Sequence, residues 1–352
     1  MKRELVVIEP DVSLSLKKDM LVFQRGDQVI RKSSLRQVQR ILLLGHQSMS
    51  ASLRFYVLRH GIDVVFLNTQ GRYLGRLSSH VSRNGPLRLA QYAFCSASDT
   101  ALPLAKVLVQ AKIHNQRQLL LKRQRRLQSE ALVQALSLLR RSYKQVEQAL
   151  SIDQLMGYEG HAASVYFGVF PLLIQAEGFA MRGRSKRPPR DNVNAALSFG
   201  YTILAQLVDS AVHQAGLDPY LGVLHQARHG LPALVMDLVE PFRPWLVDAL
   251  ILTLINREQL RGGDFYHPEE SEWAEAILEG EEPERDERPA VFMNETGRRI
   301  FFQGWHDRLR DGLIYPSQNR QLEIREIIQQ EVYAVARLFQ GEEAQFVPLQ
   351  PR

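Results

Sequence analysis

The pattern of hydrophobic residues changes near residue 100, and this change limits the folds open to the chain more than any other feature. Before it, short apolar or alternating runs such as ELVVI, VSLSL and QRILLLG are separated by Gly, Asp and Asn, which is typical of β-strands. One segment among them, ASLRFYVLRH, has helical spacing, and Gly26-Asp27 indicates a hairpin turn. From about Leu102 the spacing becomes that of long helices.

We therefore predict an α+β fold, with a β-rich N-terminal domain at residues 1–84 and a larger C-terminal all-helical domain at residues 102–352. The turn residues in HVSRNGPLRLAQ favour a linker between the two, which we place at residues 85–101. The 352 residues and 45% hydrophobic content are enough for about two folded domains.

Several functional classes are excluded by what the sequence lacks. Its single cysteine, Cys95, cannot form an intramolecular disulfide or a thiolate zinc site. The motifs of P-loop ATPases, dinucleotide-binding enzymes, serine esterases and zincins are absent. The N-terminus MKRELVVIEPDV has no long apolar stretch, and the run WLVDALILTLI is too short to cross a bilayer and contains Asp248. We therefore predict a soluble, cytoplasmic protein without membrane contact.

Positive charge is concentrated outside one acidic segment. The net charge is +6, but residues 261–290 hold 11 acidic and 3 basic side chains, a balance of −8, so the remaining chain carries +14. Such an excess favours a polyanionic partner, because Lys and Arg that neutralise phosphates release counterions. The helical region at 105–150 contains many of these residues, and they either contact phosphates or form a solvated helix face.

A second basic segment, MRGRSKRPPRDNVN, is expected to be an exposed loop, because its two consecutive prolines interrupt any helix. No acid lies between residues 182 and 190 to pair with its charges. We predict that this loop holds DNA phosphates without reading sequence. The predicted DNA-binding residues are Arg182, Arg184, Lys186, Arg187 and Arg190.

Three carboxylates and one histidine stand beside runs that belong in a core. His225, Asp237 and Glu240 border the apolar runs LVM and WLVDALIL, and Glu159 lies between glycines at the expected start of an apolar helix. A buried carboxylate is costly unless it is paired, hydrogen-bonded or bound to a metal. The prolines that follow Asp237 and Glu240 indicate the first turn of a helix, where capping is an alternative role for both acids.

Four blocks, GYEGHAASVYF, RSKRPPRDNVNAALSFGYTIL, GLDPYLGVLH and MDLVEPFRPWLVD, closely resemble the CRISPR-associated integrase family Cas1 in their order and spacing. The segments AKIHNQRQLLLKRQ and FMNETGRRIFF and the β-rich N-terminal part also look like that family. The resemblance covers nearly the whole chain, and the acidic stretch from about Asp264 to Arg288 is its least constrained part.

The resemblance implies a metal-dependent DNA integrase and endonuclease that inserts prespacer DNA into a CRISPR array during spacer acquisition. The attacking group is a DNA 3′-hydroxyl and the target is a phosphodiester at the repeat border, so no protein nucleophile is needed. The family's metal ligands correspond here to Glu159, His225 and Glu240, and Asp237 corresponds to a residue that is more often a supporting group than a ligand. Oxygen and imidazole ligands suit Mg²⁺ or Mn²⁺.

The resemblance also implies that the N-terminal domain forms a homodimer, which assembles around a dimer of the small partner Cas2. The DNA partners are double-stranded prespacer and CRISPR repeat. Two alternatives are a non-catalytic DNA-binding scaffold, whose acids only cap helices, and a branched-DNA or RNA hydrolase that uses the same metal site. Without metal, the clustered carboxylates are expected to repel one another, so removal of one should leave stability little changed or higher.

Overall fold

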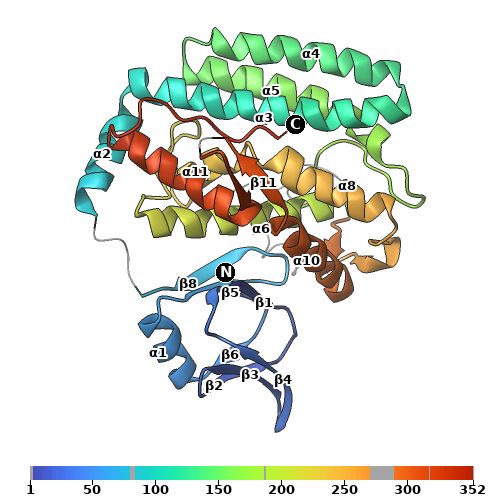
Figure 1. Cartoon of the computed structure of the whole chain (residues 1–352). Coiled ribbons are helices and arrows are strands. Elements are labelled where there is room, and N and C mark those ends of the chain that lie inside the picture. The colour runs from blue at the N-terminus through green and yellow to red at the C-terminus, as the bar shows by residue number, and fades with distance from the viewer. Residues whose placement is uncertain (1–2, 80–83, 186–187, 270–288, 317, 352) are drawn as a thin grey trace.

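The computed structural model describes residues 3–79, 84–185, 188–269, 289–316 and 318–351. A β-rich N-terminal part lies below a larger helical part in the view of Figure 1. The α+β class predicted from the sequence is therefore confirmed. The helical part also contains two short two-stranded sheets, one formed by β9 (Phe265–Tyr266) and β10 (Phe292–Met293) and the other by β11 (Gly312–Tyr315) and β12 (Arg320–Glu323).

Two four-stranded sheets form the N-terminal part. The first has the order β1-β5-β7-β8, in which β8 is antiparallel to β7 and the other pairs are parallel. The second has the order β4-β3-β2-β6. The strands are β1 (Arg3–Val7), β2 (Ser13–Lys17), β3 (Met20–Arg25), β4 (Gln28–Ser34), β5 (Val38–Leu44), β6 (Ser48–Met49), β7 (Asp63–Leu67) and β8 (Tyr73–Leu77).

Strand β5 has a continuous apolar run because both faces of its sheet are covered. Ile41 and Leu43 pack into a small core with the second sheet and with α1 (Ala51–Arg59), whereas Leu42 and Leu44 pack into the large helical core. Successive side chains of a strand point to opposite faces of the sheet. The first sheet is therefore shared between two cores, and buried apolar surface joins the N-terminal part to the helices.

Two local predictions for the N-terminal part are confirmed. The segment with helical spacing is α1, and the side chain of Ser50 caps it by accepting the N–H of Leu53. Gly26 and Asp27 connect the antiparallel strands β3 and β4, and Gly26 has a φ of +56°. This left-handed conformation is readily available to glycine.

The segment at residues 85–101, which was predicted to be a linker, is largely helical. Helix α2 spans Gly85–Ser96, and α3 begins at Ser98. The Asn84 side chain caps α2 by accepting the N–H of Leu87, and a proline occupies the first turn of that helix, where its missing N–H costs nothing. These turn residues therefore mark the start of a helix, and residues 80–83 lie outside the described residues.

The long helical region predicted at 105–150 consists of two packed helices, α3 (Ser98–Leu127) and α4 (Glu130–Glu147), and α5 (Ile152–Val169) packs against both. The other described helices are α6 (Asn192–Ala215), α7 (Ala233–Val239), α8 (Ala249–Asn256), α10 (Glu295–Leu309) and α11 (Ile324–Phe339). Two short 3-10 turns, η1 (Phe170–Leu173) and η3 (Gly262–Asp264), and one π-helical turn, η2 (Arg243–Asp248), connect them. Most of the acidic segment, residues 270–288, lies outside the described residues.

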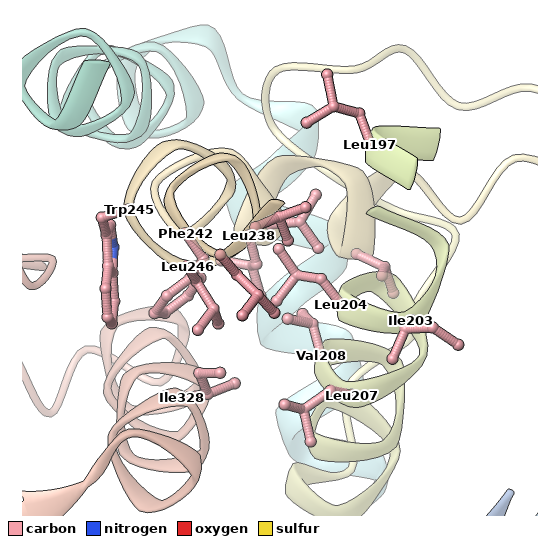
Figure 2. Close-up of a cluster of buried hydrophobic side chains, with 14 of the residues drawn as sticks. Leu197, Ile203, Leu204, Leu207, Val208, Leu238, Phe242, Trp245, Leu246 and Ile328 are labelled. Carbon is pink, nitrogen blue, oxygen red and sulfur yellow. The ribbon is translucent and has the colours of Figure 1, made fainter. Parts of the chain in front are cut away.

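Helix α6 supplies many side chains to the large core. Figure 2 shows Leu204 and Val208 of this helix next to Leu238 and Leu246, which belong to α7 and η2. By length and composition α6 is apolar enough to cross a membrane, but 72% of its most apolar window is buried inside the protein. A long, mostly buried apolar helix of this kind fits the core of a large folded domain.

Candidate metal centre

Helix α5 presents Glu159 from its interior, and not from its start as the sequence suggested. The helix begins at Ile152, where the Ser151 hydroxyl accepts the N–H of Gln154. Gly157 and Gly160 lie within the helix, and a Cβ added at either position would meet no atom within 4 Å. The two glycines therefore leave the surface beside Glu159 open, and 22% of the Glu159 side chain is exposed.

Asp237 and Glu240 lie at the end of a helix, so the prediction that they occupy a first turn is wrong. Helix α7 spans Ala233–Val239, Glu240 is its C-terminal cap residue, and the next helical turn, η2, begins only at Arg243. Negative charge is unfavourable at a helix C-terminus, so N-terminal capping does not explain either acid. Both residues are almost completely buried.

Asp237 holds His225 in place. Its Oδ2 accepts the backbone N–H groups of Val223 and Leu224 at 2.6 and 2.9 Å, and its Oδ1 accepts the N–H of His225 at 2.9 Å. The same Oδ1 lies 2.7 Å from Nδ1 of the His225 imidazole. This pairing fixes the ring and leaves Nε2 for another ligand. The geometry thus fits a supporting role for Asp237.

A lysine that the sequence analysis did not single out lies between the other two carboxylates. The ammonium of Lys112, on α3, contacts Glu159 Oε1 and lies 2.5 Å from Glu240 Oε2. Arg243 pairs with the second oxygen of Glu240 at 2.8 Å. Lys112 belongs to the segment AKIHNQRQ, where it stands among apolar core positions of α3, and a cation at such a position needs a buried anionic partner.

The charges of this cluster stabilise one another. Burial favours the neutral forms, but the two carboxylates raise the pKa of Lys112, and Arg243 and Lys112 lower the pKa of Glu240 to about 2. The expectation that the acids repel one another without metal is therefore wrong for Glu240. Removing Glu240 would leave Lys112 buried with one partner fewer, and breaking a buried pair typically costs about 3–5 kcal/mol.

Lys112 lies between the carboxylates, and within the described residues no group of three His, Cys, Asp or Glu side chains is close enough to hold a metal ion. The chemistry of the donors nevertheless fits a divalent ion. Glu240 Oε2 is buried and contacts the Lys112 ammonium, Glu159 adds a second carboxylate, and Nε2 of His225 adds an imidazole. Hard oxygen donors with one imidazole suit Mg²⁺ or Mn²⁺.

Asp248 ties three elements together beside this cluster. Its carboxylate, on η2, accepts the hydroxyls of Tyr166 on α5 at 2.8 Å and of Tyr201 on α6 at 2.5 Å. Burial raises the pKa of Asp248 to about 6. The guanidinium groups of Arg184 and Arg243 lie 5.5 and 5.0 Å from the Tyr201 ring centroid. Since Arg243 also pairs with Glu240, these contacts connect the predicted DNA-binding loop to the acidic cluster.

The loop predicted to be exposed and to bind DNA is only partly exposed. Arg184 donates to Asn194 Oδ1 at 2.7 Å and to Ser198 Oγ at 3.0 Å, and both prolines of the loop are buried. Arg182 is exposed and Arg190 is half-buried. Lys186 and Arg187 lie outside the described residues. Arg182 is thus the described arginine of this loop that best fits phosphate binding.

The C-terminal half of α3 borders a groove of about 680 Å³. This groove is lined by His114, Gln118, Leu121, Lys122, Arg125 and Gln350. Four of these side chains are polar or basic and follow one another at helical spacing on α3, as a face that contacts phosphates would require. The groove favours phosphate contact over the alternative of a merely solvated helix face.

Fold and site together define a class of protein in which a β-rich N-terminal part supports a helical part with a partly buried carboxylate and imidazole cluster. A family model described as "CRISPR associated protein Cas1" matches residues 5–307. The chain is 37% identical over 292 residues to a CRISPR-associated endonuclease Cas1 of Rhodospirillum rubrum, covering 80% of this chain and 79% of the relative. It is 32% identical over 348 residues to such an endonuclease from Thermus thermophilus, covering 98% and 96%.

Among solved structures, the fold resembles a chain of a Cas6-RT-Cas1–Cas2 complex with a TM-score of 0.81 and 26% identity, and the match covers 100% of this chain and 36% of that longer one. These matches extend over nearly the whole sequence. The chain belongs to the CRISPR-associated Cas1 family. Its curated relatives are named endonucleases, so a nuclease activity is the coarse function that the family supports.

Proposed function

We propose that this chain is a metal-dependent DNA integrase and endonuclease, which inserts prespacer DNA into a CRISPR array by transesterification at the repeat borders. The observation that carries the proposal is the convergence of Glu159 and Glu240 on one buried cationic position. Membership of the Cas1 family supports the reaction class. Structural carboxylates alone would not need an oriented imidazole beside them.

In this proposal Glu159, Glu240 and Nε2 of His225 hold Mg²⁺ or Mn²⁺. The bound ion would supply Lewis-acid chemistry, because it orients a DNA 3′-hydroxyl and offsets charge on the target phosphate. Asp237 keeps the imidazole oriented, and such supporting partners typically change metal affinity about 10–100-fold. Arg243, held beside Glu240 and over Tyr201, adds a fixed positive charge at the same place.

The proposed partners are double-stranded prespacer and repeat DNA, a second copy of the chain, and a dimer of Cas2. Arg182 and the groove along α3 are the described surfaces that fit DNA phosphates. The Cas2 partner is supported by the similarity to a structure whose chain is part of a Cas1–Cas2 complex. We also keep the prediction of a cytoplasmic location, where CRISPR arrays are accessible.

The direct test is an integration assay on a supercoiled plasmid that carries repeat and leader DNA. A fluorescent prespacer with a free 3′-hydroxyl is incubated with the chain, with and without Cas2 and with either Mn²⁺ or a chelator. We expect the label to become covalently joined to the plasmid only when the divalent ion is present. A prespacer that ends in a 3′-dideoxynucleotide is the matched control and should not be joined.

Two other outcomes would identify the alternative functions. DNA binding without joining under every condition would show a non-catalytic scaffold. Metal-dependent cleavage of branched DNA or RNA, with no joining of the prespacer, would show a hydrolase. Either result would overturn the integrase proposal.

A further inference from the structure

Lys112 is the buried cation at the centre of the acidic cluster. Its ammonium contacts Glu159 and Glu240, which belong to different elements, and 9% of its side chain is exposed. The neighbouring core positions of α3, among them Leu108, Val109 and Ile113, are apolar. Lys112 is therefore placed in the core for its charge, and the charged groups that act on its ammonium within the described residues include the two carboxylates and Arg243.

The backbone around Lys112 is anchored to the end of α7. Asn115, three residues after Lys112 on α3, donates from its side-chain amide to the carbonyl oxygen of Pro241 at 2.7 Å. Pro241 directly follows Glu240, so this bond fixes α3 against the residue that pairs with Lys112. The ammonium alone, on its flexible four-carbon stem, is free to change position while the helix stays in place.

Arg243 is less free to change position than Lys112. Its guanidinium is held between the Glu240 carboxylate and the face of Tyr201, and a planar group with two partners is less easily displaced. The site also opens on the side of Glu159, whose side chain is the more exposed of the two acids. An ion that enters from this side meets the Lys112 ammonium between the two carboxylates.

We propose that Lys112 is an internal counter-cation, which holds Glu159 and Glu240 together before metal binds and is displaced by the divalent ion. This inference rests on the proposed metal site and goes beyond it. The ammonium prevents repulsion between the two acids and keeps them at one position. The same contact competes with the metal, so Lys112 lowers the apparent metal affinity and makes the metal-free protein stable.

The test compares wild type with Lys112→Met, which keeps the length of the stem and removes the charge. Lys106→Met is the matched control, because Lys106 lies on the same helix and donates to the Glu147 carbonyl oxygen, away from the acids. Mn²⁺ binding is measured by calorimetry and thermal unfolding is followed with Mn²⁺ or chelator. We expect Lys112→Met to bind Mn²⁺ at least several-fold more tightly than wild type and to melt at a lower temperature in chelator. Lys106→Met should match wild type in Mn²⁺ binding.

A second measurement uses the unmodified protein and does not depend on the variant folding. Reductive methylation followed by peptide mass spectrometry reports how accessible each lysine amine is. We expect methylation of Lys112 to increase several-fold when Mg²⁺ is added, while methylation of Lys106 stays constant.

The outcomes separate this inference from the proposed function. If wild type and Lys112→Met bind Mn²⁺ equally, or if Lys112→Met binds it more weakly, the metal site stands and the counter-cation role is overturned. Unchanged methylation of Lys112 with Mg²⁺ has the same meaning. If neither protein binds Mn²⁺, the metal site of the proposed function and the role of Lys112 fail together.

Discussion

Gly222 controls the position of the carboxylate that orients His225. A Cβ at this position would collide with Asp237 Oδ2 and would lie 2.8 Å from the carbonyl carbon of Ala233. Gly222→Ala is therefore expected to push Asp237 away and to carry the His225 imidazole with it. Overpacking of this kind typically costs about 1–3 kcal/mol of unfolding free energy, and we expect weaker Mn²⁺ binding as well. Urea unfolding and Mn²⁺ calorimetry measure the two effects.

Gly157→Ala is the control for this substitution. A Cβ at Gly157 meets no atom within 4 Å, and the residue lies inside α5. Replacing a helical glycine by alanine typically stabilises by about 0.5–1 kcal/mol. If Gly222→Ala were as stable as wild type and bound Mn²⁺ equally well, Asp237 would not have the positioning role described.

At the scale of single residues, the sequence predicted the acids and the histidine but not the cation that pairs with them. Glu159, His225 and Glu240 were identified because they stand in recognisable blocks. Lys112 also stands in such a block, yet its role depends on how α3 packs against α5 and the end of α7. A buried charge signals that a partner exists, but only the tertiary structure shows which partner it is.

At the scale of elements, the basic loop before α6 is expected to have two kinds of arginine. Arg182→Ala should weaken DNA binding. It should also reduce the slope of log K for DNA binding against log salt concentration by about one, the change expected for one lost phosphate contact. Arg184→Ala should instead destabilise the protein by about 1–3 kcal/mol, because it removes the guanidinium donors of Asn194 Oδ1 and Ser198 Oγ and leaves Asn194 Oδ1 with the Ser185 N–H alone. DNA titrations at several salt concentrations and urea unfolding distinguish the two. Equal effects of both substitutions on DNA affinity and stability would contradict this division.

The C-terminal tail is attached to α11 through a buried acid, and this attachment predicts a pH dependence. Glu331 accepts the backbone N–H of Leu349, and burial raises the pKa of Glu331 to about 8. At pH values between the pKa of Glu331 in the unfolded chain and about 8, Glu331 is protonated in the folded protein and ionised in the unfolded chain. Stability should therefore fall as pH rises through this range, on the order of 1.4 kcal/mol per pH unit for this group.

Glu331→Gln removes this titration and keeps the acceptor oxygen. We expect this variant to unfold at a higher temperature than wild type at pH 8 to 9 and to show less dependence on pH. Thermal melts across the range pH 5 to 9 are the measurement. A variant that is less stable than wild type at pH 9 would show that Glu331 is ionised and usefully paired in the folded protein.

Among the elements themselves, the sequence predicted those with local signals. Helix α1 follows from its spacing and the turn between β3 and β4 from Gly26. Helix α2 was missed because its turn residues are also good helix starters. Its Gln91 is buried and donates to the carbonyl oxygens of Asp218 and Leu221, a contact distant in sequence that no local pattern contains.

At the scale of the whole molecule, the N-terminal part shares its first sheet with the helical core and exposes apolar side chains elsewhere. Strand β4 is an edge strand, its Val29 and Ile30 are 46% and 48% exposed, and Phe55 on α1 is 73% exposed. Exposed edges and apolar side chains favour association. We predict a homodimer formed mainly by this part of the chain.

Light scattering without DNA or Cas2 measures this association. Wild type at micromolar concentration should have the mass of a dimer, and Phe55→Glu should shift it toward the monomer without lowering the unfolding temperature of the monomer. A monomeric wild type under these conditions would count against the prediction.

The account depends most on the claim that Glu159, His225 and Glu240 act together on DNA through one divalent ion. The measurement that tests it most directly is strand transfer with Mn²⁺ by wild type, Glu159→Ala, His225→Ala and Glu240→Ala, with DNA affinity measured on the same samples. We predict that each substitution lowers strand transfer at least about a hundredfold, as loss of a charge-stabilising group typically does, while DNA affinity stays close to that of wild type. Full strand transfer by any of the three folded variants would remove that residue from the metal site.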